Sequence, residues 1–236
     1  MSLSNLQLRK RYNRRIGKFL SKLSPIVYGF KYLKVADSDK VIEINVEDIV
    51  GWYKKDNRNE LIFKGKIKPG NWPSNIRNKD LVLDKSEKYK SIKERFLQGY
   101  EWEETSIFKG RYKKKMEQYG HSAGLKILIE KAEEYRKYDR LFERIKKDNA
   151  LKPPGNGIRP MYVSILPDGK FAYSSDGNHR LYMAMILGIK KIPVQVLVRH
   201  EEWQKKRDLI LSDQTTDEAK EVREKFKNHP DIISEL

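Results

Sequence analysis

Five consecutive residues, Asp176, Gly177, Asn178, His179 and Arg180, combine side chains that can bind an anion and move a proton. They follow a strand-like segment, "KFAYSS", and precede an apolar, helix-like segment, "LYMAMILG". The first N–H groups of a helix lack an intrahelical partner and carry partial positive charge, so a helix that begins here can bind phosphate. Glycine at the turn lets the backbone approach the anion closely.

Each remaining side chain has a role in this interpretation. Arg180 can direct two parallel N–H donors at phosphate oxygens. His179 is expected to titrate near neutrality and to donate one proton, or two when charged. The Asp176 carboxylate would repel phosphate, so it fits as a metal ligand, a proton acceptor or an acceptor of loop N–H bonds. The competing interpretation is an ordinary turn and helix cap, for which Asp-Gly and Asn are common residues.

The charge of the chain points to a polyanionic partner. The formal net charge is +17, and residues 1–34 contain nine Lys or Arg and no acidic residue. Helical spacing of apolar side chains predicts a basic amphipathic helix over residues 5–23. It can dock on the body of the protein, lie on an anionic membrane surface or bind nucleic acid. The candidate contacts for the last two roles are Arg9, Arg11, Arg14, Arg15, Lys18 and Lys22.

Composition excludes several classes of protein. The chain has no cysteine, so disulfides, thiolate catalysis and cysteine-ligated metals are excluded. No segment approaches the roughly 18 apolar residues that span a bilayer, and residues 1–23 are too basic for a secretory signal. A cytoplasmic protein is expected, either free or peripheral to the membrane or nucleoid. The four histidines show no zinc-ligand spacing.

The pattern of elements predicts an α/β fold in which a small mixed sheet packs with helices. Strands are expected over 41–47, 161–166, 170–175 and 192–198, the last as a continuous apolar run. Residues 61–73 are compatible with a hairpin. Helical structure is expected over 86–119, with breaks near Gly99 and at Lys109-Gly110, and as one or two helices over 125–150 that end at Asn149. Further helices are expected over 178–187 before Gly188 and in the last 36 residues. There Thr215 and Glu218 have capping-box spacing.

The segment "DGNHRLYMAMILGIKKIPVQVLV" resembles the ParB/sulfiredoxin superfamily, in which a strand leads through such a turn into a helix and then into an "[IV]-P-V" strand. "VIEINVEDIV" resembles the first strand of that domain, and "YDRLFERIKKDNALKPP" resembles its helix and exit. The resemblance covers about 110 to 120 residues in two blocks. It implies three parts: a basic arm (1–36), a domain (37–200) with a largely helical insertion at about 54–124, and C-terminal helices (201–236).

The resemblance also implies a nucleotide-phosphate site at the turn. Gly177, Asn178, His179 and Arg180 would hold the phosphates of ATP, ADP or CTP, and Asp176 and His179 would be the catalytic residues, with Asp176 also organising Mg²⁺. The chain lacks the nucleophilic cysteine of sulfiredoxins, and too few residues follow "VQVLV" for the helix-turn-helix module of partition proteins.

The motif is closest in form to the free serine kinases. Their additional glutamate has no clear counterpart in "GWYKKDNRNE", so serine phosphorylation itself is not implied. Two hypotheses follow: a nucleotide-dependent phosphotransferase or nucleotide hydrolase, and a ParB-like nucleic-acid-binding protein or nuclease that uses the basic arm. Trp72 and Trp102, both in the insertion, are candidates to line an acceptor pocket and equally candidates for the core. The acceptor, the choice of nucleotide and the oligomeric state stay open.

Overall fold

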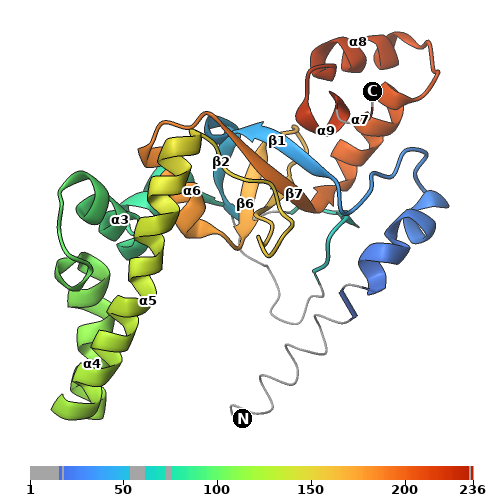
Figure 1. Ribbon diagram of the computed structural model, residues 1–236. Helices are drawn as coiled ribbons and strands as arrows, with labels where there is room; N and C mark the ends of the chain where they lie inside the picture. The colour runs from blue at the N-terminus through green and yellow to red at the C-terminus, as the bar shows by residue number, and fades with distance from the viewer. Residues whose placement is uncertain (1–15, 18, 54–61, 73–75, 234, 236) are drawn as a thin grey trace. The chain divides into compact units, whose positions relative to one another are not determined.

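The computed structural model describes residues 16–17, 19–53, 62–72, 76–233 and 235, which form two compact units (Figure 1). The first unit contains the described residues up to Arg77 together with Pro153–Asp176 and the described residues from Pro193 onward. The second unit contains Asn78–Lys152 and Gly177–Ile192. Each of the two units is therefore built from segments that are distant in the sequence.

A seven-stranded mixed sheet is the centre of the first unit. Its order is β1-β7-β5-β6-β2-β4, and β3 pairs with β7 outside this path. The pairs β2–β6, β3–β7 and β5–β7 are parallel, whereas β5 and β6 are antiparallel neighbours. The strands are β1 (Val41–Asn45), β2 (Ile49–Tyr53), β3 (Lys66–Lys68), β4 (Ile76–Asn78), β5 (Tyr162–Ile165), β6 (Phe171–Ser175) and β7 (Lys191–His200). The prediction of a mixed α/β fold is confirmed at this level.

The strand patterns account for the position of the core. β1 alternates exposed and buried residues, as expected for a strand with one buried face. β7 is buried along almost its whole length, as its continuous apolar sequence predicts. A short 3-10 helix, Val46–Asp48, separates β1 from β2. The expected strand at 41–47 is therefore two residues shorter in the structure.

The possible hairpin in residues 61–73 is not present in residues 62–72, which are the part of this segment that the structure describes. The segment forms the short strand β3, which pairs in parallel with the end of β7 through Lys66↔Val198 and Lys68↔His200. Its strand partner comes from a part of the chain about 130 residues away. The turn formers after β3 make a local turn instead, in which the N–H of Trp72 donates to the carbonyl of Gly70 over 2.8 Å.

Helices at both ends of the chain complete the first unit. Residues 16–17 and 19–29 are helical, and they are followed at the C-terminus by α7 (Glu201–Leu211), α8 (Asp217–Phe226) and α9 (Pro230–Ile233). The hydroxyl of Thr216 accepts a hydrogen bond from the N–H of Ala219, so Thr216 is the N-cap of α8. The predicted cap at Thr215 is one residue too early, because either threonine precedes an equally suitable helix start.

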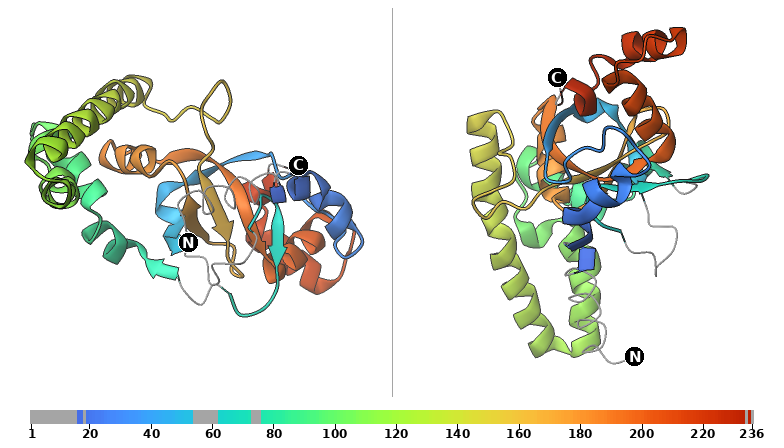
Figure 2. Two further views of the ribbon diagram at one scale, coloured as in Figure 1. Left: turned by 90° about the horizontal axis from the view of Figure 1, so that it is seen from below. Right: turned by 90° about the vertical axis from the view of Figure 1, so that its right-hand side faces the viewer.

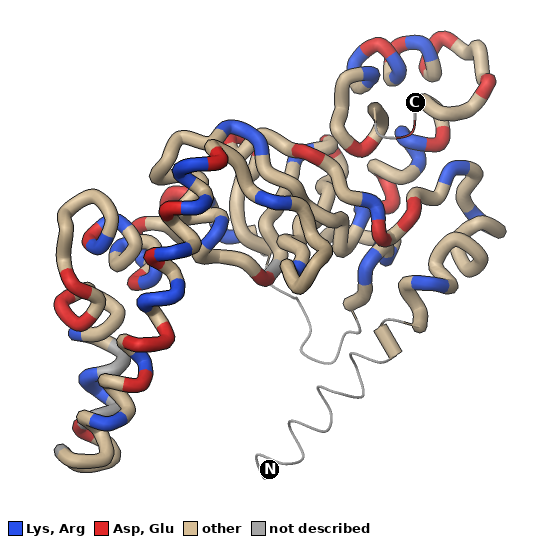
Figure 3. The backbone as a smooth tube through the Cα atoms, in the orientation of Figure 1, with Lys and Arg blue, Asp and Glu red and all other residues tan. Residues whose placement is uncertain are grey.

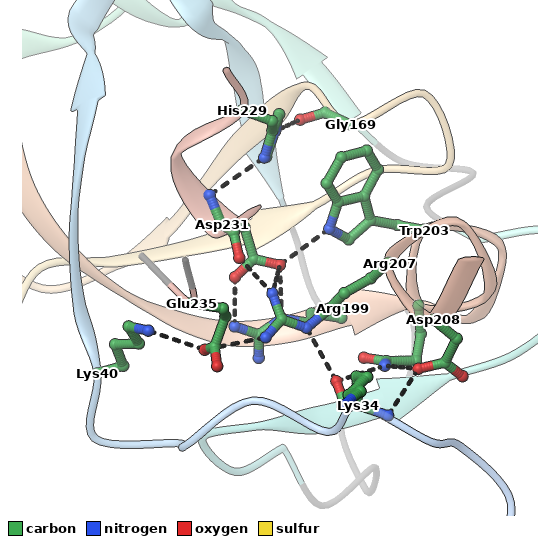
Figure 4. A network of polar contacts seen from close by, with 11 residues as sticks. Lys34, Lys40, Gly169, Arg199, Trp203, Arg207, Asp208, His229, Asp231 and Glu235 are labelled. Atoms are coloured by element: carbon green, nitrogen blue, oxygen red, sulfur yellow. Dashed lines mark hydrogen bonds and ion pairs between the residues drawn. The ribbon is translucent and has the colours of Figure 1, made fainter. Parts of the chain in front are cut away.

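A buried polar network fixes the C-terminal helices on the sheet (Figure 4). Asp231 accepts hydrogen bonds from Arg199 Nη2 over 2.6 Å and Arg199 Nε over 3.1 Å, and from Trp203 Nε1 over 3.0 Å. Arg207 donates to the carbonyl of Asp231, and the N–H of Asp231 donates to His229 Nδ1. Because the charged groups Asp231, Arg199 and Arg207 are buried, the network depends on complete pairing of its charges.

The second unit is helical, and its long helix α5 extends along it (Figure 2). α5 ends as predicted, since Asn149 follows it in the left-handed conformation, with φ of 46°. Trp102 and Phe108 lie in the core with Tyr135 of α5. The elements are α2 (Lys79–Asp84), α3 (Glu87–Leu97), a 3-10 turn (Trp102–Glu104), a π-helical turn (Phe108–Tyr112), α4 (Lys113–Tyr119), α5 (His121–Asp148) and α6 (Asn178–Ile186).

Candidate phosphate-binding turn

The strand–turn–helix arrangement predicted around the Asp176–Arg180 motif is present. β6 ends at Ser175, Asp176 and Gly177 form the turn, and α6 begins at Asn178. Both turn residues have left-handed backbone, with φ of 58° at Asp176 and 72° at Gly177. The hydroxyl of Tyr173 donates to the carbonyl of Asp176 and stabilises the end of β6. Aspartate tolerates this conformation better than most residues, and glycine adopts it without strain.

The two compact units meet in the sequence within this motif. Asp176 is the last residue of its segment in the first unit, and Gly177 opens the α6 segment of the second unit. Asp176 is exposed. The phosphate-binding residues of the prediction, Gly177 to Arg180, therefore belong to one unit, and the predicted metal ligand belongs to the other.

The N-terminus of α6 has no side-chain cap. Gly177 occupies the N-cap position, and no side chain there accepts a hydrogen bond from the first turn. Asn178 Oδ1 and His179 Nε2 are buried and make no hydrogen bond in the structure. A bound anion could accept hydrogen bonds from the uncapped amides at the start of this helix. Buried polar side-chain atoms without hydrogen bonds are uncommon in folded proteins, so a ligand is one way to satisfy them. Arg180 is half-buried in the same turn.

His179 is held between aromatic rings of α5. Its imidazole stacks on Tyr138, with ring centroids 4.1 Å apart, and meets the edge of Tyr135 at 5.7 Å. Burial, with the positive charges of Lys88 and Lys137, lowers the pKa of His179 to about 4. The expectation that His179 titrates near neutrality is corrected: at pH 7 the ring is neutral and can donate a single N–H.

Two lysines extend the positive field at this helix start. Lys88 lies in α3 and Lys137 in α5, and their charges act on the imidazole of His179. With the α6 dipole they make the surroundings of His179 electropositive. Sequence analysis did not find these lysines, because each stands in a helix rich in lysine and glutamate and nothing local distinguishes it. Only the packing of α3 and α5 around α6 selects them.

The donor groups fit Mg²⁺ only in combination with a substrate. Among the residues that the structure describes, no group of three or more His, Cys, Asp or Glu side chains could hold a metal ion. Within the Asp176–Arg180 turn, Asp176 offers one exposed carboxylate. Mg²⁺ is commonly bound by one or two carboxylates, water and substrate phosphates, so a single carboxylate is compatible with an ion that arrives with a nucleotide.

The two candidate tryptophans of the acceptor pocket are core residues. Trp102 is fully buried in the second unit, where its Nε1–H donates to Asp139 over 3.0 Å. Trp72 is buried in the first unit and packs against Tyr53 and His200. They belong to separate units. Both side chains thus have a structural role, which was the second interpretation of their sequence positions.

Most of the basic arm lies outside the described residues. This applies to Arg9, Arg11, Arg14, Arg15 and Lys18, whereas Lys22 is exposed on the helix that ends at residue 29. The role of these residues toward nucleic acid or a membrane stays a prediction.

The first unit contains a cavity of about 550 Å³ that sequence analysis missed. Tyr162 and Gln195 line it, and they pair with each other across β5 and β7, while Tyr162 pairs with Ser175 at the end of β6. Gln195 Nε2 donates to the carbonyl of Asp39 over 2.6 Å, which fixes the orientation of the amide. Its Oε1 is buried and has no partner. The cavity walls come from several distant segments, so no local pattern could reveal them.

Comparison with known proteins adds no relative. The chain matches no protein-family model, no curated protein and no solved structure.

Proposed function

We propose that this protein is a nucleotide-dependent phosphotransferase or nucleotide hydrolase with a ParB/sulfiredoxin-like fold that binds phosphate at the Asp176–Arg180 turn. The observation that carries the proposal is the start of α6, where Gly177 leaves the first amides without a side-chain cap. The lysine charges that act on His179 support it, because they favour an anion at the same helix end.

Each polar residue of the Asp176–Arg180 turn has a separate role in the proposed phosphoryl transfer. The amides of the first turn of α6 and the Arg180 guanidinium hold phosphate oxygens and spread their charge. His179, neutral at pH 7, donates one N–H and adds no charge. Asp176 accepts the proton of the attacking hydroxyl or water, or coordinates Mg²⁺. When bound with the nucleotide, Mg²⁺ would neutralise charge on the phosphate oxygens.

Thermal denaturation with nucleotides tests the proposal. ATP, ADP or CTP with Mg²⁺, at about 100 times its Kd, should stabilise the wild type by about 2.7 kcal/mol, or roughly 5–10 °C in Tm. Arg180→Ala should lose the shift. Arg140→Ala, which removes an exposed arginine from α5 of the same unit, should keep it.

Phosphate release and transfer to hydroxyl acceptors then distinguish hydrolase from transferase. A wild-type protein whose Tm responds to none of the three nucleotides would refute the proposal, and so would an Arg180→Ala variant that responds as the wild type does.

A further inference from the structure

The N-terminal helix, described over residues 16–17 and 19–29, buries its smallest side chains against the first unit. Gly17, Ser21 and Ser24 recur at helical spacing, and both serines are almost completely buried. Ser24 Oγ donates to the carbonyl of Ser21 over 2.9 Å, and the Oγ of Ser38 donates to the same carbonyl over 3.2 Å. A Cβ built on Gly65 would lie 3.0 Å from Ser24 Oγ, so the rest of the unit approaches this face closely.

The opposite side of the same segment presents large apolar side chains to solvent. The most exposed is Phe30, with 91% of its surface accessible. Phe19 and Ile26 are seven positions apart in the helix and therefore lie on one face, and Val27 follows Ile26. Phe30 and Leu33 continue the exposed apolar set in the turn and bend that follow the helix. A surface helix ordinarily buries its large apolar side chains, but here Phe19, Ile26 and Val27 are exposed, while Ser21 and Ser24 are buried. We call this set the apolar stripe: Phe19, Ile26, Val27, Phe30 and Leu33.

The apolar stripe belongs to a segment that is firmly attached to the first unit. Glu201 of α7 accepts hydrogen bonds from Lys31 Nζ over 2.6 Å and from the Tyr32 hydroxyl over 2.7 Å. Asp208 of α7 accepts from the backbone N–H groups of residues 33 and 34. These bonds hold the end of the segment with the stripe facing outward, so its exposure is a feature of the folded unit.

The charges of the segment select the partner. In the sequence, residues 16–34 contain four lysines and no acidic residue, and residues 9–15 add five basic residues. Figure 3 shows the part of this segment after residue 18 with Lys and Arg in blue and without red. Phenylalanine, isoleucine and leucine side chains make poor contacts with nucleic-acid phosphates. A second copy of the chain would bring like charges together. An anionic bilayer matches both the exposed apolar side chains and the positive charge of the segment. The acyl chains can surround the apolar side chains, and the headgroups attract the lysines.

We infer that the apolar stripe docks the protein on an anionic lipid surface, with the helix lying in the plane of the headgroups. No helix in the described part of the chain is long and apolar enough to cross a membrane, so the contact is peripheral. Phe19, Ile26 and Phe30 would enter the interface, and Lys22, exposed at the flank of the stripe, would contact lipid phosphate or carboxylate groups. This inference is independent of the proposed nucleotide chemistry.

Flotation with lipid vesicles tests the inference. The full chain should bind vesicles of phosphatidylcholine with phosphatidylserine, and bind phosphatidylcholine alone weakly, with a strong decrease at high salt. Replacing Ile26 and Phe30 together by serine should reduce the partition coefficient about 10-fold or more. Replacing Leu97 and Ile129, which are 59% and 56% exposed in the second unit, by serine should leave binding unchanged.

A fluorescent probe locates the contact. The chain has no cysteine, so Gly29→Cys can carry an environment-sensitive label next to Phe30, and no atom lies within 4 Å of a Cβ at that position. A blue shift with anionic vesicles, absent from a label at Gly99 in the second unit, supports docking at the stripe. Thermal melts of the serine variants should match the wild type, since the replaced side chains are exposed.

Three results would overturn the inference. The first is equal binding to neutral and anionic vesicles, or no binding to either. The second is a self-association in solution that the Ile26 and Phe30 double substitution abolishes, because the stripe would then be covered by a second copy. The third is a loss of duplex DNA binding in that variant with unchanged vesicle binding.

Discussion

Gly169 lies so close to the indole of Trp203 that a Cβ at this position would be 2.7 Å from Cζ3 of the ring. Its φ of 90° is also a conformation that side chains disfavour. Gly169→Ala should therefore lower the free energy of unfolding by roughly 2–4 kcal/mol, as the sum of backbone strain and overpacking. Urea denaturation measures the loss.

Gly70 provides the matched control for that substitution. Its φ is 87°, but no atom lies within 4 Å of a Cβ built there. Gly70→Ala should cost only the backbone strain, about 1–2 kcal/mol. An equal decrease in the free energy of unfolding for Gly169→Ala and Gly70→Ala would show that the contact with Trp203 does not restrict the side chain at position 169.

Removing the Asp231 carboxylate should take from buried Arg199 its ion pair with Asp231 and take from buried Arg207 one of two carboxylates, since Arg207 still contacts Glu235 over 2.9 Å. Asp231→Ala should destabilise the protein by about 3–5 kcal/mol, because the charges of Arg199 and Arg207 stay buried. Asp217→Ala removes a fully exposed carboxylate paired with Lys220, and it should change stability by less than about 0.5 kcal/mol. Chemical denaturation of both variants at pH 7 compares them, and a small loss for Asp231→Ala would contradict the importance of the network.

The same carboxylate makes stability depend on pH in the acid range. Burial by itself raises the pKa of Asp231, but the charge and hydrogen bonds of Arg199, together with Arg207 and Trp203, outweigh burial and lower the pKa to about 2. The unfolded carboxyl has a pKa near 3.8. The stabilisation is therefore complete above about pH 4 and is lost as the pH falls toward 2. Unfolding of wild type between pH 5 and about 2 should show a decline that Asp231→Ala lacks.

His179 gives a second pH dependence, at higher pH and in the same direction. Because burial lowers its pKa from 6.5 to about 4, the unfolded state takes up the proton first when the pH falls. Stability should decrease between about pH 6.5 and pH 4, by about 3 kcal/mol at most. His179→Phe keeps a ring against Tyr138 and removes the titration, so its stability should vary less over this range. Identical pH profiles for the two proteins would show that His179 is not buried as a neutral ring.

Substitutions of Asp176 can distinguish an effect on catalysis from an effect on stability. Asparagine tolerates the left-handed backbone found here, with φ of 58°, so Asp176→Asn should keep the Tm within about 1–2 °C of the wild type. Asp176→Val should be destabilised by about 1–2 kcal/mol, since a β-branched residue is strained in this conformation.

If Asp176 is the base or metal ligand, Asp176→Asn should lose phosphate transfer or release by about 100-fold or more and still show the nucleotide-dependent rise in Tm. Full turnover in Asp176→Asn would exclude Asp176 from the chemistry and leave the phosphate-binding proposal to the Arg180 experiment.

Elements whose signals are local could be predicted from the amino-acid sequence alone. Asn149 ends α5, the apolar run of β7 is buried, and the Asp-Gly pair forms the turn between β6 and α6. Periodicity, caps and turn residues act over a few positions, so they can be recognised without knowledge of the rest of the chain. The mixed α/β character of the fold follows from the order of those elements.

Contacts between residues that are distant in the sequence could not be predicted and are seen only in the folded protein. α5 supplies the tyrosines that bury His179 and shift its pKa, and β3 pairs with a strand far along the chain instead of forming a hairpin. The N-terminal helix turns its serines inward and leaves Phe19 and Ile26 exposed, although its periodicity alone is that of a helix that buries its apolar side. These outcomes depend on close packing between segments that are remote in sequence. The free energy of that packing cannot be predicted from a local sequence pattern.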